Sequence, residues 1–107
     1  MLTPTKKIYT IEEIKEKVTP IFEKRGVIQA VIFGSYATGK AHEESDIDFV
    51  VKVDENMCLF EFAGISGDVE EALEKRIDFL PMHHVPKGGE IDMVVRERGL
   101  IIFDEIR

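Results

Sequence analysis

The sequence predicts an α/β (α+β) fold in which a small mixed sheet of about four strands packs against helices. Short β-rich runs alternate with segments of helical hydrophobic spacing, a pattern that favours helices layered on one sheet. A chain of 107 residues can bury one modest core, and it contains no internal repeat, low-complexity segment or linker. We therefore expect one domain over residues 1–107.

The first predicted element is an amphipathic helix over residues 11–24. Thr10 and Glu13 have the spacing of a capping box, in which each side chain bonds the backbone N–H of the other residue. Apolar residues then recur at helical spacing. Pro20 is expected to kink this helix rather than end it, and Gly26 is expected to end it.

Four short runs rich in β-branched and aromatic residues are the predicted strands: residues 27–33, 47–53, 76–82 and 100–103. The other predicted segments are a leader over residues 1–9, a helical turn and loop over 36–45, a helical segment over 57–75 interrupted by Gly64 and Gly67, a turn over 86–89, and a short helix marked by Ile91, Val94 and Val95. Helices and strands therefore alternate throughout.

The charge balance argues against a nucleic-acid partner. The chain has 14 Lys and Arg residues against 21 Asp and Glu residues, which gives a formal net charge of −7. An acidic domain repels a phosphate backbone, and the sequence shows no basic stripe. A bound divalent cation can still bring a nucleotide to such a domain, because the charge of the ion reverses the local electrostatics.

The single cysteine, Cys58, excludes an intramolecular disulfide and a zinc site built from cysteines. This usage suits a reducing cytoplasm, and we expect Cys58 to be a small core residue. No apolar run approaches the roughly 18–20 residues that cross a bilayer, and Lys6 and Lys7 are not followed by the apolar stretch of a signal peptide. The sequence thus predicts a cytoplasmic domain with no membrane partner.

The first candidate site segment is Gly34-Ser35, which ends a predicted strand and opens a helical turn. The first N–H groups of such a turn have no intrahelical partner, and with the serine hydroxyl they can hold phosphate oxygens. Gly34 lets the backbone approach a ligand closely because it has no Cβ. We interpret this segment as a nucleotide-phosphate site; an ordinary turn is the alternative.

Asp46 and Asp48 lie two residues apart at the start of the next predicted strand. Side chains alternate faces along a strand, so both carboxylates point to one side, roughly 6–7 Å apart. The flanking residues are apolar, and two carboxylates on a buried strand are costly unless a cation compensates them. Mg²⁺ is the expected ion, because it binds one or two carboxylates together with substrate phosphates.

Asp78 is the third candidate carboxylate, in another strand-like apolar run. If that strand neighbours the one that carries Asp46 and Asp48, Asp78 completes a three-carboxylate cluster. Such a cluster can hold two metal ions, activate an acceptor hydroxyl and stabilise a leaving pyrophosphate. The alternative for Asp78 is an ion pair with a neighbour such as Arg76.

These segments together resemble the signature of the polymerase-beta-like nucleotidyltransferases, and in particular of their minimal nucleotidyltransferase (MNT) group. The resemblance rests on Gly34-Ser35-x-Ala37-x-Gly39 and, five residues later, Ser45-Asp46-x-Asp48. MNT domains have roughly 100 residues, so the likeness covers nearly the whole chain. The sequence departs from the family at Thr38, where the family usually has Arg.

The resemblance implies the polymerase-beta-like fold and a role for each motif residue. Asp46 and Asp48 would be catalytic metal ligands that also contact the nucleotide, and Asp78 would be the third catalytic carboxylate and metal ligand. Gly34 and Ser35 would contact the triphosphate. Mg²⁺, as two ions, would be the cofactor, and ATP the substrate.

The resemblance also implies a protein partner. Many MNT proteins are antitoxins paired with an all-helical HEPN toxin of the RNase type, and the MNT chain transfers AMP from ATP to a tyrosine hydroxyl of that toxin. The chain has few residues left to build an acceptor pocket, which favours an acceptor on another protein. Two alternatives stay open: an antitoxin that neutralises its partner by binding alone, and AMP transfer to a small molecule. A homo-oligomer or a hetero-oligomer is compatible with each of these functions.

Other candidate residues carry weaker signals. His42, His83 and His84 have no ligand partner at helical spacing, so we do not assign them to a metal. An apolar group is interpreted as core or interface: Met57, Leu59, Phe60 and Phe62. Two acidic pairs are interpreted as solvated faces: Glu43-Glu44 and Glu70-Glu71.

Overall fold

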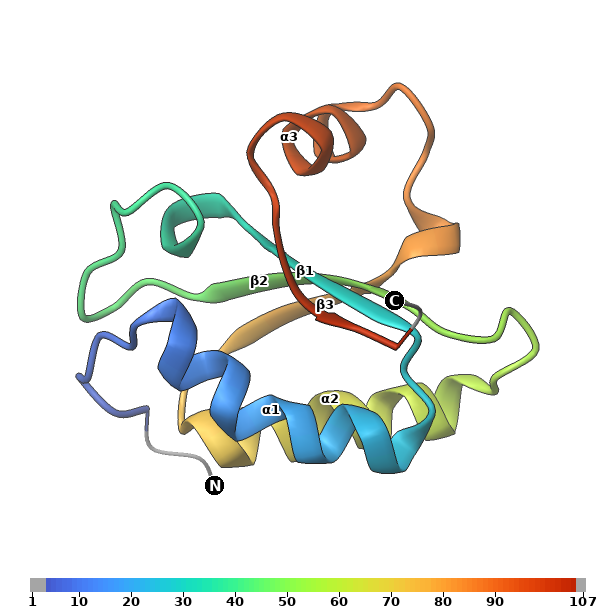
Figure 1. Ribbon diagram of the computed structural model, residues 1–107, viewed down its shortest axis with the longest axis horizontal. Helices are drawn as coiled ribbons and strands as arrows, with labels where there is room; N and C mark the ends of the chain where they lie inside the picture. Colours follow the sequence, from blue (N-terminus) through green and yellow to red (C-terminus); the bar gives the residue numbers. More distant parts are fainter. Residues whose placement is uncertain (1–3, 106–107) are drawn as a thin grey trace.

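The computed structural model describes residues 4–105 and places four strands and three α-helices among them (Figure 1). The strands are β1 (Gln29–Phe33), β2 (Ile47–Lys52), β3 (Ile77–Pro81) and β4 (Leu100–Asp104). The helices are α1 (Ile11–Arg25), α2 (Leu59–Leu73) and α3 (Glu90–Arg98). Two short 3₁₀ turns, η1 (Gly34–Tyr36) and η2 (Met82–His84), follow β1 and β3.

The four strands form one mixed sheet in the order β3-β2-β1-β4. β1 pairs antiparallel with both β2 and β4, whereas β2 and β3 are parallel. The connection from β2 to β3 runs through α2, because two parallel neighbours need a crossover. The predicted small mixed sheet is therefore confirmed.

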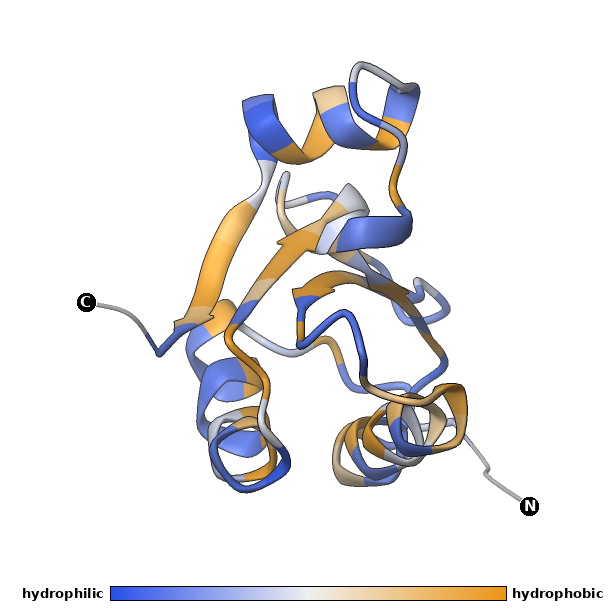
Figure 2. Cartoon of the chain, turned by 90° about the vertical axis from the view of Figure 1, so that its right-hand side faces the viewer, coloured by the Kyte–Doolittle hydropathy of each residue, from blue (hydrophilic) through white to orange (hydrophobic). Residues whose placement is uncertain are grey.

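Helices cover the two faces of the sheet unequally. Figures 1 and 2 show α1 and α2 side by side on one face and α3 alone on the other. The main core lies between the sheet and the α1/α2 pair. Phe22 of α1 contacts the ring of Phe49 of β2 with their ring centroids 6.4 Å apart. Strand alternation then directs Asp48 and Val50, the neighbours of Phe49, toward the α3 face.

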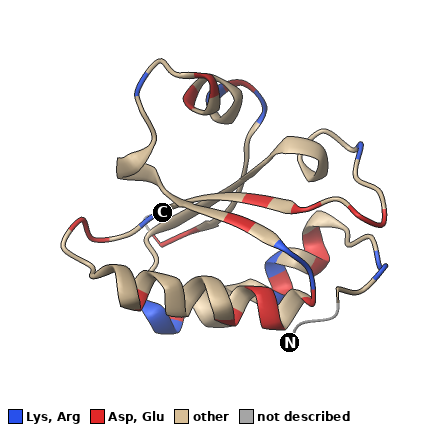
Figure 3. Cartoon of the chain, turned by 180° about the vertical axis from the view of Figure 1, so that it is seen from behind, with Lys and Arg blue, Asp and Glu red and all other residues tan. Residues whose placement is uncertain are grey.

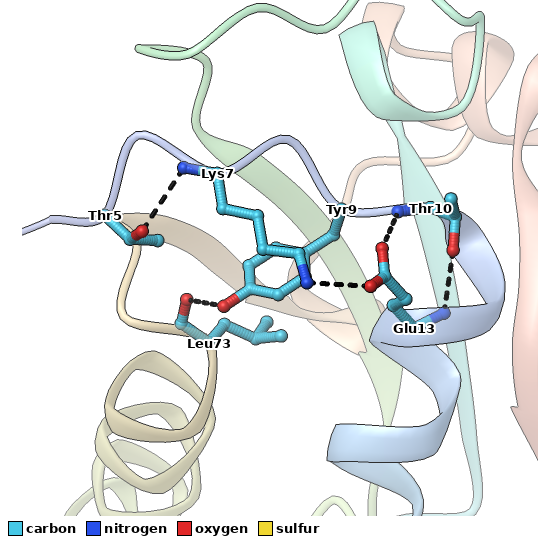
Figure 4. Close-up of polar contacts among 6 residues, drawn as sticks. All are labelled: Thr5, Lys7, Tyr9, Thr10, Glu13 and Leu73. Carbon is cyan, nitrogen blue, oxygen red and sulfur yellow. Dashed lines mark hydrogen bonds and ion pairs between the residues drawn. The ribbon is translucent and has the colours of Figure 1, made fainter.

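Helix α1 begins and ends as its sequence predicts. The Glu13 N–H donates to Thr10 Oγ1 at 3.1 Å, and the Thr10 N–H donates to Glu13 Oε1 at 2.8 Å (Figure 4). Gly26 caps the other end with φ +80°, a conformation that glycine adopts without steric cost. The helix continues through Pro20.

The predicted leader is packed against α2 over the part that the structure describes; residues 1–3 lie outside it. Tyr9 is buried, and its hydroxyl donates to the Leu73 carbonyl at 2.7 Å (Figure 4). The Thr5 N–H donates to the Glu74 carbonyl at 2.7 Å. These two bonds attach the segment before α1 to the end of α2, just ahead of β3.

Helix α2 corrects one sequence prediction, because it runs from Leu59 to Leu73 without interruption. A Cβ at Gly64 would lie 2.8 Å from Nη2 of Arg25, so this glycine allows close approach of α1 to α2. Arg25 forms an ion pair with Asp68 beside it. Gly64 therefore serves helix packing rather than breaking the helix.

The start of α2 corrects a second prediction. Cys58 is exposed rather than a core residue, and its Sγ accepts a hydrogen bond from the Glu61 N–H at 3.4 Å as the N-cap of the helix. Leu59 and Phe60 are 78% and 90% exposed, and only Phe62 of this group is buried. The cap bond holds the Cys58 thiol at the helix end, so Cys58 does not join the core.

Several segment boundaries also differ from the sequence prediction by one or more residues. The helical turn after β1 covers residues 34–36 and precedes the expected range 36–45, and residues 27–28 lie outside β1. Within residues 4–105, no helix combines the length and the apolar character that crossing a bilayer requires.

Candidate functional site

Three motif segments meet at one end of the sheet, on the face that α3 partly covers. β1 and β2 are antiparallel, so the end of β1 meets the start of β2, and Phe33 pairs with Asp48. β2 and β3 are parallel, so their starts meet, and Asp48 pairs with Asp78. Figure 3 shows acidic positions on both of these neighbouring strands. The topology therefore brings the Gly34-Ser35 turn to the two aspartates.

Asp48 and Asp78 form a close pair of carboxyl groups on neighbouring strands. Burial raises the pKa of Asp48 to about 7, and a side-chain hydrogen bond with Asp78 and the negative charges of Asp78 and Asp46 act in the same direction. Two carboxylates this close cannot both ionise cheaply. Without a cation the pair therefore holds a proton up to near-neutral pH.

Gly34 lies directly against this pair. Its φ is +76°, and a Cβ built on it would overlap the Asp48 carboxylate. Two requirements thus select glycine here: a left-handed backbone and the absence of a side chain beside Asp48. The η1 turn that follows presents its first N–H groups at the same end of the sheet, where they can bind phosphate oxygens.

Asp46 is exposed just before β2, and the loop in front of it is shaped by Ser45. The Ser45 Oγ accepts from the His42 N–H at 2.9 Å, and the Ser45 N–H donates to the His42 carbonyl at 3.0 Å. The Ile47 N–H donates to the Arg76 carbonyl at 3.2 Å. These bonds fix the backbone on both sides of Asp46.

Lys75 is a structural residue of the site that sequence reasoning missed. Its side chain is 2% exposed, and its Nζ donates to the carbonyls of Thr5 at 3.0 Å and Glu43 at 2.9 Å. It therefore joins the segment before α1 to the loop between η1 and β2 (residues 37–46, the motif loop), next to the start of β3. In the sequence, a lysine between Glu74 and Arg76 is indistinguishable from a solvated surface lysine.

A cavity of about 440 Å³ lies beside Asp46. It is lined by the motif loop around Glu43 and Glu44, by Lys75 and Arg76, and by the segment before α1. Its walls carry charges of both signs, so it differs from an apolar ligand pocket.

The carboxyl groups fit a divalent cation in part. Asp48 and Asp78 are adjacent, and their shared negative charge would be relieved by an ion. Within residues 4–105, however, no three His, Cys, Asp or Glu side chains are grouped closely enough to hold a metal. The pair suits Mg²⁺, which binds one or two protein carboxylates and completes its shell with phosphates and water.

The remaining candidates lie outside the carboxylate pair. His42 is exposed and its Nδ1 accepts from the Glu44 N–H at 3.3 Å, and the rings of His83 and His84 contact each other edge to face in η2. The ion pairs among the described residues do not include Asp78, so its alternative pairing with Arg76 is not formed there. Thr38 is exposed, and its Oγ1 donates to the Gly34 carbonyl at 3.3 Å.

Known proteins are similar to this chain in sequence and in fold. The family described as polymerase beta, nucleotidyltransferase, matches residues 16–105. Protein adenylyltransferase MntA of Thermococcus cleftensis is 36% identical over 82% of this chain and 92% of its own length. A Methanocaldococcus jannaschii protein, provisionally named a protein adenylyltransferase, is 41% identical over 70% of this chain and 81% of its own length.

Two solved structures show the same fold at low sequence identity. A toxin–antitoxin structure with AMP-PNP matches with a TM-score of 0.72 and 18% identity, over 84% of this chain and 73% of that one. The complex of tri-AMPylated Shewanella oneidensis HEPN toxin with MNT antitoxin matches with a TM-score of 0.68 and 14% identity, over 88% of this chain and 72% of that one. From the extent of the family match and the identity to these relatives, the chain belongs to the polymerase beta nucleotidyltransferase family, among the protein adenylyltransferases.

Proposed function

We propose that this chain is an antitoxin that transfers AMP from ATP to a tyrosine hydroxyl of a HEPN-type toxin. The observation that carries the proposal is the pairing of Asp48 with Asp78 beside the Gly34-Ser35 turn, which supports a cation site next to a phosphate site. The protein adenylyltransferase relatives support the reaction. The solved HEPN–MNT complex supports the class of partner.

Each motif residue has a defined task in this reaction. The N–H groups of the η1 turn and the Ser35 hydroxyl bind the β- and γ-phosphates of ATP. Asp46, Asp48 and Asp78 are the residues that would hold Mg²⁺, as one or two ions. Bound Mg²⁺ would neutralise the triphosphate and lower the pKa of the acceptor hydroxyl.

The acceptor oxygen attacks the α-phosphorus, the bond from that phosphorus to the bridging oxygen breaks, and pyrophosphate leaves. We assign the acceptance of the hydroxyl proton to Asp78, because it is more exposed than Asp48 and lies at the edge of the sheet. Asp48 is positioned by Gly34 and stays with the nucleotide. This division gives the paired carboxylates different roles.

Intact-mass spectrometry tests the proposal directly. The chain is incubated with ATP, Mg²⁺ and the HEPN partner, and each addition of AMP raises the mass of the partner. Asp48→Asn and Asp78→Asn are expected to abolish the addition, whereas Glu71→Gln, a change of an exposed carboxylate on α2, is expected to leave it unchanged. An unchanged partner mass with the wild-type chain would contradict the enzymatic proposal.

Thr38 is the observation that favours a second candidate, neutralisation of the partner by binding alone. The short neutral side chain lies at the phosphate turn, where the family has Arg. In that case the partner loses its toxic activity with no change of mass. AMP addition to a small molecule but not to the HEPN protein would support the third candidate. Location in the cytoplasm and the oligomeric state stay predictions.

A further inference from the structure

A second cavity, of about 380 Å³, lies between α3 and the sheet. It opens on the same face as Asp48, and its floor includes Val31 of β1 and Val50 of β2. Its other walls come from η2, α3 and β4. Gly99 closes it tightly at one side, because a Cβ there would lie 2.7 Å from the Val31 side chain. The cavity is thus formed by the docking of α3 on this face.

The cavity follows the carboxylate site along β2, on the same face of the sheet. Val50 is two residues beyond Asp48 on the same face, which places the near edge of the cavity roughly 7 Å from that residue. The far edge is Gln29, whose partner in the register is Lys52, four residues beyond Asp48 and roughly 13 Å away. A nucleoside monophosphate in an extended conformation spans this range, with its phosphate at the carboxylates.

We propose that this cavity binds the purine ring of the donor nucleotide, with adenine preferred. The proposal rests on the proposed function, since it needs the α-phosphate to lie at Asp48 and Asp78. A purine is flat and apolar on both faces and polar at its edge, and the cavity has matching walls. Its apolar walls are Val31, Val50, Met82, Val85, Val95 and Ile101.

Gln29 supplies the polar edge. A glutamine side chain can form two hydrogen bonds with adenine, accepting from the exocyclic amine and donating to a ring nitrogen. Gln29 Nε2 donates to Asp104 Oδ2 at 3.4 Å, so one N–H of the amide is engaged by Asp104, and we assign Oε1 as the acceptor for the base. The amine of adenine satisfies that acceptor, whereas the carbonyl of guanine repels it.

Arg96 supplies a planar charged group at the rim of the cavity. Its Nε donates to Asp92 Oδ1 at 3.1 Å, and its side chain is 68% exposed. The Asp92 carboxylate also accepts from the Gly88 N–H at 2.8 Å, so the ion pair is anchored to the turn before α3. A guanidinium held by one edge can stack its face on a purine ring.

The test separates binding of the base from binding of the phosphates. Calorimetry measures the affinity of the whole chain, in Mg²⁺, for ATP, GTP and inorganic tripolyphosphate. Val95→Phe fills the cavity, and Met93→Phe is the matched control on an exposed position of the same helix outside the cavity. We expect Val95→Phe to weaken ATP binding by about tenfold or more and to leave tripolyphosphate binding unchanged.

The phenylalanine ring of Val95→Phe can also weaken binding by displacing α3, so a second variant leaves α3 unchanged. Gln29→Leu is expected to reduce the preference for ATP over GTP by about tenfold, with no change for tripolyphosphate. Equal ATP binding by Val95→Phe and Met93→Phe, with the ATP preference retained in Gln29→Leu, would overturn this inference and leave the proposed function standing. A wild-type chain that binds neither ATP nor tripolyphosphate would overturn both.

Discussion

The Asp48 carboxylate occupies the space that a Cβ at residue 34 would fill, so Gly34 and Asp48 are in direct contact across the β1–β2 pair. This contact links the two halves of the motif, the Gly34-Ser35 turn and the strand β2 that carries Asp48. A substitution at Gly34 is therefore expected to have two separable effects, one on stability through backbone strain and one on AMP transfer.

Gly34→Ala is expected to reduce AMP transfer roughly a hundredfold or more, because the new methyl group displaces the Asp48 carboxylate from its position. It should also lower the free energy of unfolding, since alanine at φ +76° costs about 1–2 kcal/mol. Intact-mass kinetics and urea unfolding measure the two effects.

Gly26→Ala is the matched control for Gly34→Ala. Gly26 has φ +80° with no atom within 4 Å of a Cβ, so this variant has the backbone strain without the overlap. It should lose similar stability and keep its transfer rate. Adding Gly34→Ala to an Asp48→Ala chain should cost less stability than adding it to the wild type. Equal transfer by Gly34→Ala and Gly26→Ala would show that the contact has no catalytic consequence.

The Asp48–Asp78 pair predicts a pH-dependent stability in the absence of metal. The pKa of Asp48 is raised from 3.8 to about 7, so between these pH values the folded chain holds a proton that the unfolded chain has released. The free energy of unfolding therefore falls as pH rises through this window and is constant above it. Allowing for partial exposure, we expect a loss of about 1–3 kcal/mol.

Asp48→Asn should remove this loss and be more stable than the wild type at pH 8 in EDTA. Urea unfolding at pH 4.5 and pH 8 measures it. Asp92→Asn should instead be less stable than the wild type at both pH values, because the Gly88 N–H and Arg96 lower the pKa of Asp92 and its ionised form, present throughout this window, stabilises the fold. An Asp48→Asn chain whose stability falls between these pH values as steeply as that of the wild type would contradict the assignment to Asp48.

Mg²⁺ is expected to offset the loss of stability that ionisation of the Asp48–Asp78 pair causes. Because metal and proton compete for the same carboxylates, the rise in melting temperature on adding Mg²⁺ should be larger at pH 8 than at pH 5.5. Thermal unfolding with and without Mg²⁺ measures this difference. Asp48→Asn should lose most of it, whereas Glu71→Gln should keep it. A rise that is independent of pH would place the ion elsewhere.

Much of the site could be predicted from the sequence, because its chemistry lies in local motifs. The capping box at Thr10 and the Gly34-Ser35 turn are set by neighbouring residues. The parallel pairing of β2 with β3 agrees with sequence order, since a helix between two strands favours parallel neighbours, whereas the register that pairs Asp48 with Asp78 is seen only in the structure. The roles of these residues in catalysis stay predictions.

The features that sequence reasoning missed depend on contacts between distant segments. Lys75 is buried because the segment before α1 and the motif loop both close over it, and neither contact has a local signal. In the sequence Gly64 resembles a helix breaker, because its partner, Arg25, lies on another helix. The small apolar side chain of Cys58 predicts a core position and gives no sign of a cap.

Lys75 yields a prediction about local mobility. Lys75→Met keeps the aliphatic stem but removes the N–H groups that hold the carbonyls of Thr5 and Glu43. The motif loop should then open more often, and the amides of Ser45 and Ile47 should exchange with solvent roughly tenfold faster. Hydrogen-exchange mass spectrometry measures this change, with Lys17→Met, an exposed lysine of α1, as the control. Unchanged exchange in residues 40–47 would mean that the loop does not depend on Lys75.

Thr38→Arg tests whether the departure from the family motif limits the reaction. Thr38 is exposed, and its bonds to the Gly34 and Ser35 carbonyls are long, at 3.3 Å and 3.5 Å, so a larger side chain fits with little loss. An arginine beside the η1 turn adds charge-assisted hydrogen bonds to the triphosphate, and we expect the KM for ATP to fall roughly tenfold. Thr38→Gln has a similar length without the charge and should leave KM unchanged. If both variants behave alike, residue 38 does not contact the phosphates, and the threonine is a neutral replacement.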